Sequence, residues 1–88
     1  MKIKNGLKLR EVGGINIVVA VGDMAANFKG VVRLNESGTF LWKHLEKDTD
    51  EGELVTALLD KYDVTDDVAK NDVATFLSTI RNAGFLDE

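Results

Sequence analysis

The spacing of apolar residues changes once along the chain, from a period of two to a period of three or four. Leu7 to Val12 alternates like a half-buried strand, and Ile15 to Val21, rich in β-branched residues, predicts a central strand. Gly13-Gly14 between them can supply the positive φ angles of a tight hairpin. Gly22 to Lys29 is expected to be a loop, and Gly30 to Leu34 a third strand. These segments predict an antiparallel sheet with the second strand in the middle.

The rest of the chain predicts three helices, each beginning at a residue that can cap it. Asn35, Asp50 and Thr65 are the expected N-caps, because a short polar side chain can accept a hydrogen bond from the first turn. Behind each cap, apolar residues recur at helical spacing: Phe40, Leu41, Trp42 and Leu45; Leu54, Ala57, Leu58 and Tyr62; Ala69, Val73, Phe76, Leu77 and Ile80. Gly84 is expected to end the last helix, with Phe85 and Leu86 folding back onto the core. Strands followed by helices predict an α+β fold.

Composition narrows the class of protein. A chain of 88 residues with 44% hydrophobic and 30% charged residues is expected to form one small globular domain over residues 1–88. It has no Cys, no apolar run near the ~20 residues of a membrane span and no apolar core behind its basic start. We therefore expect a cytoplasmic protein that does not enter a membrane. The net charge of −4 disfavours nucleic-acid binding, which needs a concentrated positive field.

Few side chains are suited to catalysis or metal binding. His44 is the single histidine, and Ser37 is seven residues away on the same helix, about 10 Å along its axis and beyond hydrogen-bond reach. The acidic run 48–53 fails the spacing of a calcium loop, because Gly52 stands at a ligand position. Most other carboxylates stand at helix starts, where capping explains them. We therefore expect no catalytic residue, no metal site and no cofactor, and hence no enzyme.

Three blocks of the sequence carry a family resemblance. They are LNESGTFLW at 34–42, DTDEGELVTALLDKYDV at 48–64 and DVATFLSTIRNAGFL at 72–86. In this order and spacing they resemble the PqqD-like family, whose type member is pyrroloquinoline quinone synthesis protein D. The resemblance covers almost the whole chain. It implies a winged helix-turn-helix-like fold, a three-stranded antiparallel sheet followed by three helices.

The resemblance also implies a function. Such domains bind the leader segment of a ribosomally made precursor peptide and present it to a modifying enzyme, often a radical SAM enzyme. In the family the leader adds as a strand to the third strand and packs beside the third helix. The residue pattern agrees at one point, because Leu7 to Val12 carries several charges that discourage pairing, whereas Gly30 to Leu34 carries only Arg33. An unprotected edge can accept an extended peptide.

The third helix offers two flanks that could complete such a site, and the sequence does not say which one faces the strand. One flank has Lys70, Ala74, Leu77 and Arg81, and the other has Asp72, Thr75, Phe76, Thr79 and Ala83. The residues we expect to bind the peptide are Val31, Val32, Arg33, Leu34, Lys70, Val73, Ala74, Phe76, Leu77 and Arg81.

Other interpretations stay open at this point. The apolar residues of the third strand could be core alone, and Arg33 could be a solvated cation. A winged-helix DNA-binding regulator would read DNA with the third helix, but Asp66, Asp67 and Asp72 would then meet phosphates. A protein–protein adaptor with no peptide substrate differs only in its partner. Because an open edge can pair with its own copy, the protein is expected to be a monomer or a weak homodimer.

Overall fold

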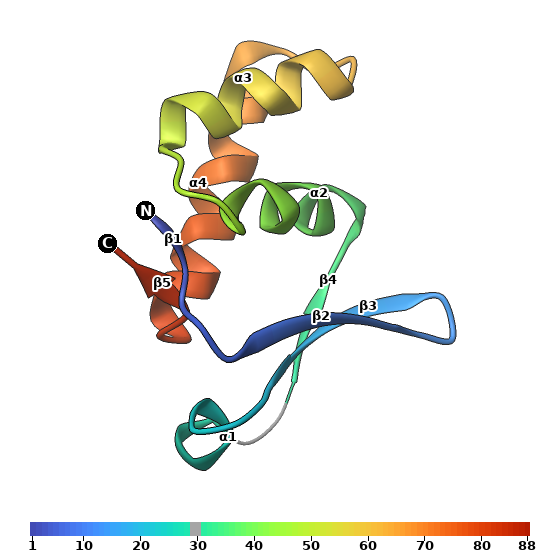
Figure 1. The fold of residues 1–88 in the computed structure, drawn as a ribbon. Coiled ribbons are helices and arrows are strands. Elements are labelled where there is room, and N and C mark those ends of the chain that lie inside the picture. Colours follow the sequence, from blue (N-terminus) through green and yellow to red (C-terminus); the bar gives the residue numbers. More distant parts are fainter. Residues whose placement is uncertain (29–30) are drawn as a thin grey trace.

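The computed structural model describes residues 1–28 and 31–88 (Figure 1). Its main sheet contains β2 (Leu7–Val12), β3 (Ile15–Ala20) and β4 (Val32–Leu34), antiparallel and in that order. The predicted order is confirmed, with β3 in the middle. The third strand is shorter than expected, since β4 begins at Val32, and Gly30 lies outside the described residues.

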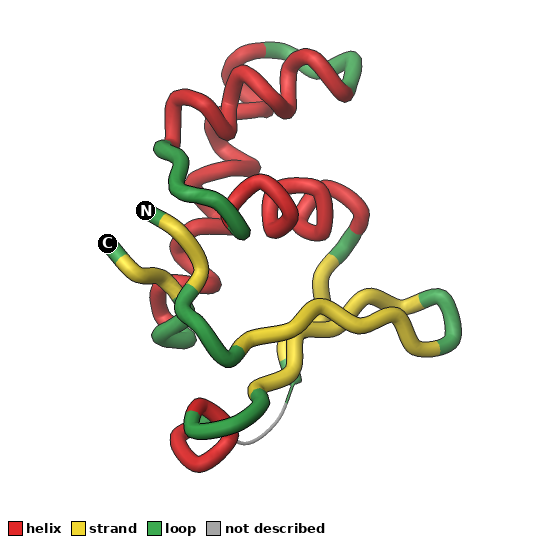
Figure 2. The backbone as a smooth tube through the Cα atoms, viewed as in Figure 1, coloured by secondary structure: helices red, strands yellow, loops and turns green. Residues whose placement is uncertain are grey.

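The register leaves part of the hairpin uncovered. β2 pairs with β3 along its whole length, from Leu7 opposite Ala20 to Val12 opposite Ile15. β4 pairs only with residues 16–18 of β3, so the end of the β2–β3 hairpin projects beyond it (Figure 2). The radius of gyration is 12.9 Å, slightly above the roughly 12 Å expected for this length.

Three helices follow the sheet, and each begins where its cap predicts. They are α2 (Glu36–Leu45), α3 (Glu51–Lys61) and α4 (Asp66–Asn82). The side chains of Asn35 and Asp50 each accept a backbone N–H at 2.8 Å, and that of Thr65 accepts one at 3.3 Å. Each bond satisfies an N–H that the first turn would leave free. Gly84 takes the left-handed φ of +79° that ends α4.

The core lies among the three helices and under the sheet. The largest fully buried side chains are those of Trp42, Phe85, Leu41, Leu45, Leu54, Leu58, Leu77, Ile80, Val18 and Val73. The rings of Trp42 and Phe85 meet edge to face with centroids 6.2 Å apart. The apolar stripes and the return of Phe85 and Leu86 to the core are therefore confirmed.

Three short elements were not predicted. β1 (Lys2–Ile3) and β5 (Leu86–Asp87) pair antiparallel and bring the two ends of the chain together (Figure 1). α1 (Met24–Asn27) forms a single turn inside the segment expected to be a loop. Two-residue strands and a one-turn helix are too short to show any periodicity. The loop expected over Gly22 to Lys29 was wrong at Met24–Asn27, whereas no prediction had been made for the structure of β1. In the part of the chain described here, no helix is long and apolar enough to cross a membrane.

Candidate functional site

β4 is an edge strand with one free side. Within residues 1–28 and 31–88 it pairs only with β3. In an antiparallel strand every second residue directs its N–H and C=O away from the partner, so β4 presents unpaired backbone groups to solvent. Lys8, Arg10 and Glu11 are exposed on β2, at the opposite edge. Charges of this kind discourage further pairing, so β4 is the edge better able to accept another strand.

Asn35 joins β4 to α2 without a linker. Its backbone is extended, with φ −76° and ψ −177°, and so continues the strand. Its side chain already caps the helix by accepting a hydrogen bond from the N–H of Gly38. Its carbonyl accepts two more bonds at 2.9 Å, from the N–H and the hydroxyl of Thr39. One residue thus ends the strand and starts the helix, which fixes the direction in which β4 leaves the sheet.

Gly38 brings three elements close together. A Cβ at this position would lie 3.6 Å from Leu34 Cβ of β4 and 3.6 Å from Phe76 Cδ1 of α4. These are ordinary van der Waals distances, and the closest atom to such a Cβ would be Asn35 Oδ1, at 2.9 Å. A glycine in the first turn of a helix is unfavourable by propensity alone, and the closeness of this capping oxygen accounts for its presence.

A groove of about 430 Å³ lies beside this junction, between the end of β4 and the middle of α4. We call it the β4–α4 groove. Its lining includes Arg33, Gly38, Asp72, Thr75, Phe76 and Thr79. Leu41 and Phe76 are buried lining residues and give the groove an apolar floor, whereas Asp72 and Thr75 supply polar walls. The arrangement suits an extended chain that carries both apolar and polar side chains.

The structure brings together only some of the residues expected to bind a peptide. Val32 and Leu34 are half-buried against the core, whereas Val31 and Arg33 are exposed. Arg33 and Phe76 line the β4–α4 groove.

The remaining expected residues of α4 lie elsewhere. Val73 and Leu77 are buried in the core, at 0% and 1% exposed. Lys70 and Ala74 line a separate hollow with Val55 of α3. Arg81 pairs with Glu88. The flank of α4 that borders β4 is therefore the one with Asp72, Thr75, Phe76 and Thr79, a choice that the sequence left open.

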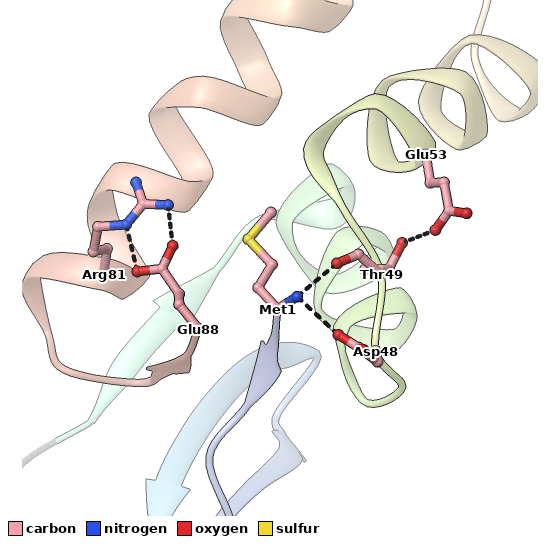
Figure 3. Close-up of polar contacts among 6 residues, drawn as sticks. All are labelled: Met1, Asp48, Thr49, Glu53, Arg81 and Glu88. Carbon is pink, nitrogen blue, oxygen red and sulfur yellow. Dashed lines mark hydrogen bonds and ion pairs between the residues drawn. The ribbon is translucent and has the colours of Figure 1, made fainter.

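Ion pairs hold the two chain ends (Figure 3), and none of their residues lines the β4–α4 groove. The Arg81 guanidinium donates to both carboxylate oxygens of Glu88, at 3.1 and 2.9 Å. These bonds lower the pKa of the Glu88 carboxyl. The ammonium group of Met1 donates to Asp48 Oδ1 and to the carbonyl of Thr49, both at 2.8 Å, and lowers the pKa of Asp48. These contacts tie the two chain ends beside β1 and β5 to the loop between α2 and α3 and to α4.

The residues that could carry chemistry are otherwise engaged. Ser37 lines the groove, but its hydroxyl donates to Asn35 Oδ1 at 3.3 Å. His44 is exposed, with Nδ1 3.1 Å from the carbonyl of Phe40. In residues 1–28 and 31–88 no cluster of three His, Cys, Asp or Glu side chains could hold a metal ion. What the described part of the chain offers is a binding surface of backbone edge and groove.

Sequence reasoning did not identify every lining residue. Asn35, Ser37 and Asn71 also border the groove, although Asn35 was assigned only a capping role. The one signal that could have located the groove was Gly38, since a glycine in a first turn indicates a close approach by another element.

The fold and its edge groove define a small α+β binding domain, and comparison with known proteins gives its family. The chain belongs to the PqqD family: the family model described as coenzyme PQQ synthesis protein D matches residues 18–86. The resemblance stated from the sequence is thereby confirmed. No curated protein matches the chain significantly.

One solved structure extends the comparison to three dimensions. The chain is similar to TbiB1 in complex with the TbiA(beta) leader peptide, with 21% identity and a TM-score of 0.77. The match covers 99% of this chain and 95% of that one. At this identity the likeness establishes a shared fold, and it confirms the predicted α+β architecture with a three-stranded antiparallel sheet.

Proposed function

We propose that the protein binds the leader segment of a ribosomally made precursor peptide and presents it to a modifying enzyme. The leader adds as a strand to β4 and lays alternate side chains into the β4–α4 groove. The enzyme is of the radical SAM class that the family resemblance implies. The protein acts as a single cytoplasmic accessory domain, without a catalytic residue of its own.

The observation that carries this proposal is the groove running beside a free strand edge. β4 has only three residues, and each main-chain hydrogen bond is worth about 1 kcal/mol net. Backbone pairing alone would therefore bind weakly. The apolar floor of Leu41 and Phe76 supplies the side-chain contacts that strand addition needs for affinity and choice of sequence. TbiB1, which shares the fold, is in complex with a leader peptide.

The geometry also suggests how the peptide is held. Val31 to Leu34 pair with it through their main chain, and Phe76 packs against an apolar side chain of the leader. Arg33 at one end of the groove favours an acidic leader residue, while Asp72 favours a basic one or a hydrogen-bond donor. Thr75 and Thr79 wall the α4 side, in place of the Lys70, Ala74 and Arg81 set expected from the sequence.

A DNA-binding role finds no support in α4. Asp66 and Asp67 are exposed in its first turn, which is where a recognition helix contacts bases and phosphates. Carboxylates at that place would repel the DNA backbone.

The test begins by identifying the leader, by passing a lysate of the source organism over the immobilised domain and sequencing retained peptides by mass spectrometry. The leader is then synthesised in two forms, with N-methyl groups on odd-numbered or on even-numbered amides. Because a strand bonds its neighbour through every second residue, one form should lose binding at least tenfold and the other should keep it. Equal affinity of the two forms would rule out strand addition.

A pair of substitutions on α4 tests the groove. Thr75→Arg places a long cation in the β4–α4 groove and should weaken leader binding at least tenfold, measured by calorimetry. Ala74→Arg is the matched control, because Ala74 is also exposed but lines the hollow towards α3. The control should bind like the parent. If Ala74→Arg were the damaging change, the peptide would lie on the flank first expected from the sequence.

A further inference from the structure

A second hollow lies on the other side of the β4–α2 junction. The projecting end of the β2–β3 hairpin, the face of α2 and the end of α3 border an open hollow of about 680 Å³. We call this space the hairpin hollow. It meets the β4–α4 groove at Arg33 and Asn35, which line both. The rest of its lining is separate, so the two spaces can hold different chains.

The hairpin hollow is basic, although the protein is acidic. Arg33, Lys43 and Lys61 line it, against the single carboxylate of Glu36. The protein as a whole carries a net charge of −4. Three exposed cations gathered on an acidic molecule create a local positive field that attracts carboxylates. Ion pairs explain none of them, since the ion pairs found among residues 1–28 and 31–88 involve Met1, Asp48, Arg81 and Glu88.

Apolar groups stand beside these cations. Phe40 and Tyr62 are half-buried in the hollow and meet edge to face, with centroids 5.8 Å apart. Ile15 also lines it and is 40% exposed, while its partner across the hairpin, Val12, is 60% exposed. Val12 and Ile15 suit a strand as β-branched residues, but at the hairpin end their side chains leave apolar surface in water. A partner that covered them would remove apolar surface from water.

We propose that the hairpin hollow docks a segment of the modifying enzyme that carries carboxylates beside aliphatic or aromatic side chains. This inference rests on the proposed function, because it names the surface by which the enzyme finds the loaded domain. Carboxylates pair with Lys43 and Lys61, while an apolar side chain packs against Ile15, Phe40 and Tyr62. The leader is a poorer candidate for this hollow, since β4 ends at Leu34 and its edge does not extend along the hairpin.

The test uses a synthetic probe and the full chain labelled with ¹⁵N. The probe is an acetylated dodecapeptide in which pairs of Asp and Glu alternate with Leu and Phe, and its control has Lys in place of every acid. We expect the acidic probe to shift the amide signals of Ile15, Lys43 and Lys61, and to bind more weakly as salt rises. The lysine control should leave them unmoved. Equal shifts with both peptides, or none with the acidic one, would overturn the proposal.

Matched charge-reversal variants test whether the acidic probe binds in the hairpin hollow. Lys43→Glu/Lys61→Glu should weaken binding of the acidic probe about tenfold, because two favourable pairs become repulsive. Lys4→Glu/Lys47→Glu makes the same charge change on exposed lysines outside the hollow and should leave binding unchanged. Equal loss in both variants would reduce the effect to net charge and contradict a docking site.

The same spectra separate this inference from the proposed function. Leader binding is read from the signals of Thr75 and Phe76, and probe binding from those of Ile15 and Lys61. Failure of the leader to bind, with the probe still in the hollow, would remove the proposed function and with it the enzyme as the occupant, and would leave only a surface that binds acidic segments. If the leader shifted the amide signals of Ile15 and Lys61, the hollow would be assigned to the peptide. If raising the concentration of the protein alone shifted them, it would be assigned to a second copy. Either result would overturn an enzyme-docking role.

Discussion

At the scale of single residues, the placement of the strand edge depends on Asn35 and Gly38. Asn35 Oδ1 accepts the N–H of Gly38 at 2.8 Å, and the same oxygen would lie 2.9 Å from a Cβ added to Gly38. Real Cβ atoms do not approach an oxygen so closely. In this arrangement an added Cβ would force Asn35 Oδ1 to shift, although the cap of α3 shows that a bond of 2.8 Å can be made to the N–H of a residue with a side chain, Glu53.

Gly38→Ala should leave the stability nearly unchanged, without the usual gain of about 0.5 to 1 kcal/mol from replacing a helical glycine. The added methyl group displaces the cap of Asn35, and losing such a cap costs about 1 kcal/mol. Urea unfolding followed by circular dichroism measures the difference.

Gly52→Ala is the matched control for that change. Gly52 is also in the first turn of a helix, two residues after its cap, and an added Cβ would meet Asp50 Oδ1 only at 3.4 Å. It should therefore gain about 0.5 to 1 kcal/mol of stability from propensity. Equal effects of the two substitutions would show that the closeness of residue 38 to Asn35 Oδ1 is unimportant.

The contact between Arg81 and Glu88 should affect how the stability of the fold changes with pH in the acid range. The bonds from Arg81, followed by smaller charge effects, depress the pKa of Glu88 below its ordinary 4.5. A carboxyl whose pKa is lower in the folded than in the unfolded state adds stability at pH values above its unfolded-state pKa. That stability is lost as the pH falls through its folded-state pKa. Glu88→Gln should make the unfolding midpoint vary less between about pH 5 and pH 3. An unchanged slope would mean that the pair is too exposed to matter.

At the scale of helices and strands, the sequence predicts what local signals determine. The N-caps at Asn35, Asp50 and Thr65 act on the adjacent turn, and the apolar stripe of α4 repeats over several turns, so both can be read without a structure. The flank of α4 that borders β4 depends on how α2 packs between them, which no local pattern contains. The hairpin hollow likewise arises because β4 covers only residues 16–18 of β3.

The pairing of β1 with β5 was not predicted either, because it also depends on residues far apart in the sequence. Ile3 is opposite Leu86, and the N–H of Lys4 donates to the carbonyl of Phe85 at 2.9 Å. The two strands are more than eighty residues apart in sequence, so only the folded core brings them together. Ile3 stands between Lys2 and Lys4, so the hydrophobic pattern gave no sign that it is buried.

Ile3→Ala should therefore cost far more than its place in a two-residue strand implies. Ile3 is 9% exposed and belongs to the core, and removing such a side chain costs about 2 to 4 kcal/mol. Lys2→Ala in the same strand alters an exposed side chain and should change stability by less than about 0.5 kcal/mol. Thermal unfolding of both variants measures the two losses of stability. A small effect at Ile3 would mean that β1 is not part of the folded core.

At the scale of the whole molecule, the two candidate surfaces share one boundary. The β4–α4 groove and the hairpin hollow lie on either side of the junction where β4 becomes α2, and Arg33 lines both. The acidic starts of α3 and α4 carry much of the negative charge. This separation leaves three cations, Arg33, Lys43 and Lys61, against the carboxylates of Glu36 and Asp72 in the lining of the two surfaces. It favours acidic partners there and disfavours contact between two copies through that region.

The same charge should keep the protein monomeric despite its open edge. Two copies pairing antiparallel through β4 would bring their Arg33 side chains near each other across the new ladder, and like charges so placed repel. With three residues on each strand, the few hydrogen bonds gained, about 1 kcal/mol each, would not offset that repulsion and the entropy of association. Arg33→Val removes the charge and leaves a β-branched apolar edge, so it should raise self-association measurably in sedimentation equilibrium at micromolar to millimolar concentration. Arg33→Lys keeps the charge and should remain monomeric. If the parent protein already dimerised, and did so equally in both variants, contact would lie elsewhere and β4 would stay free for a peptide.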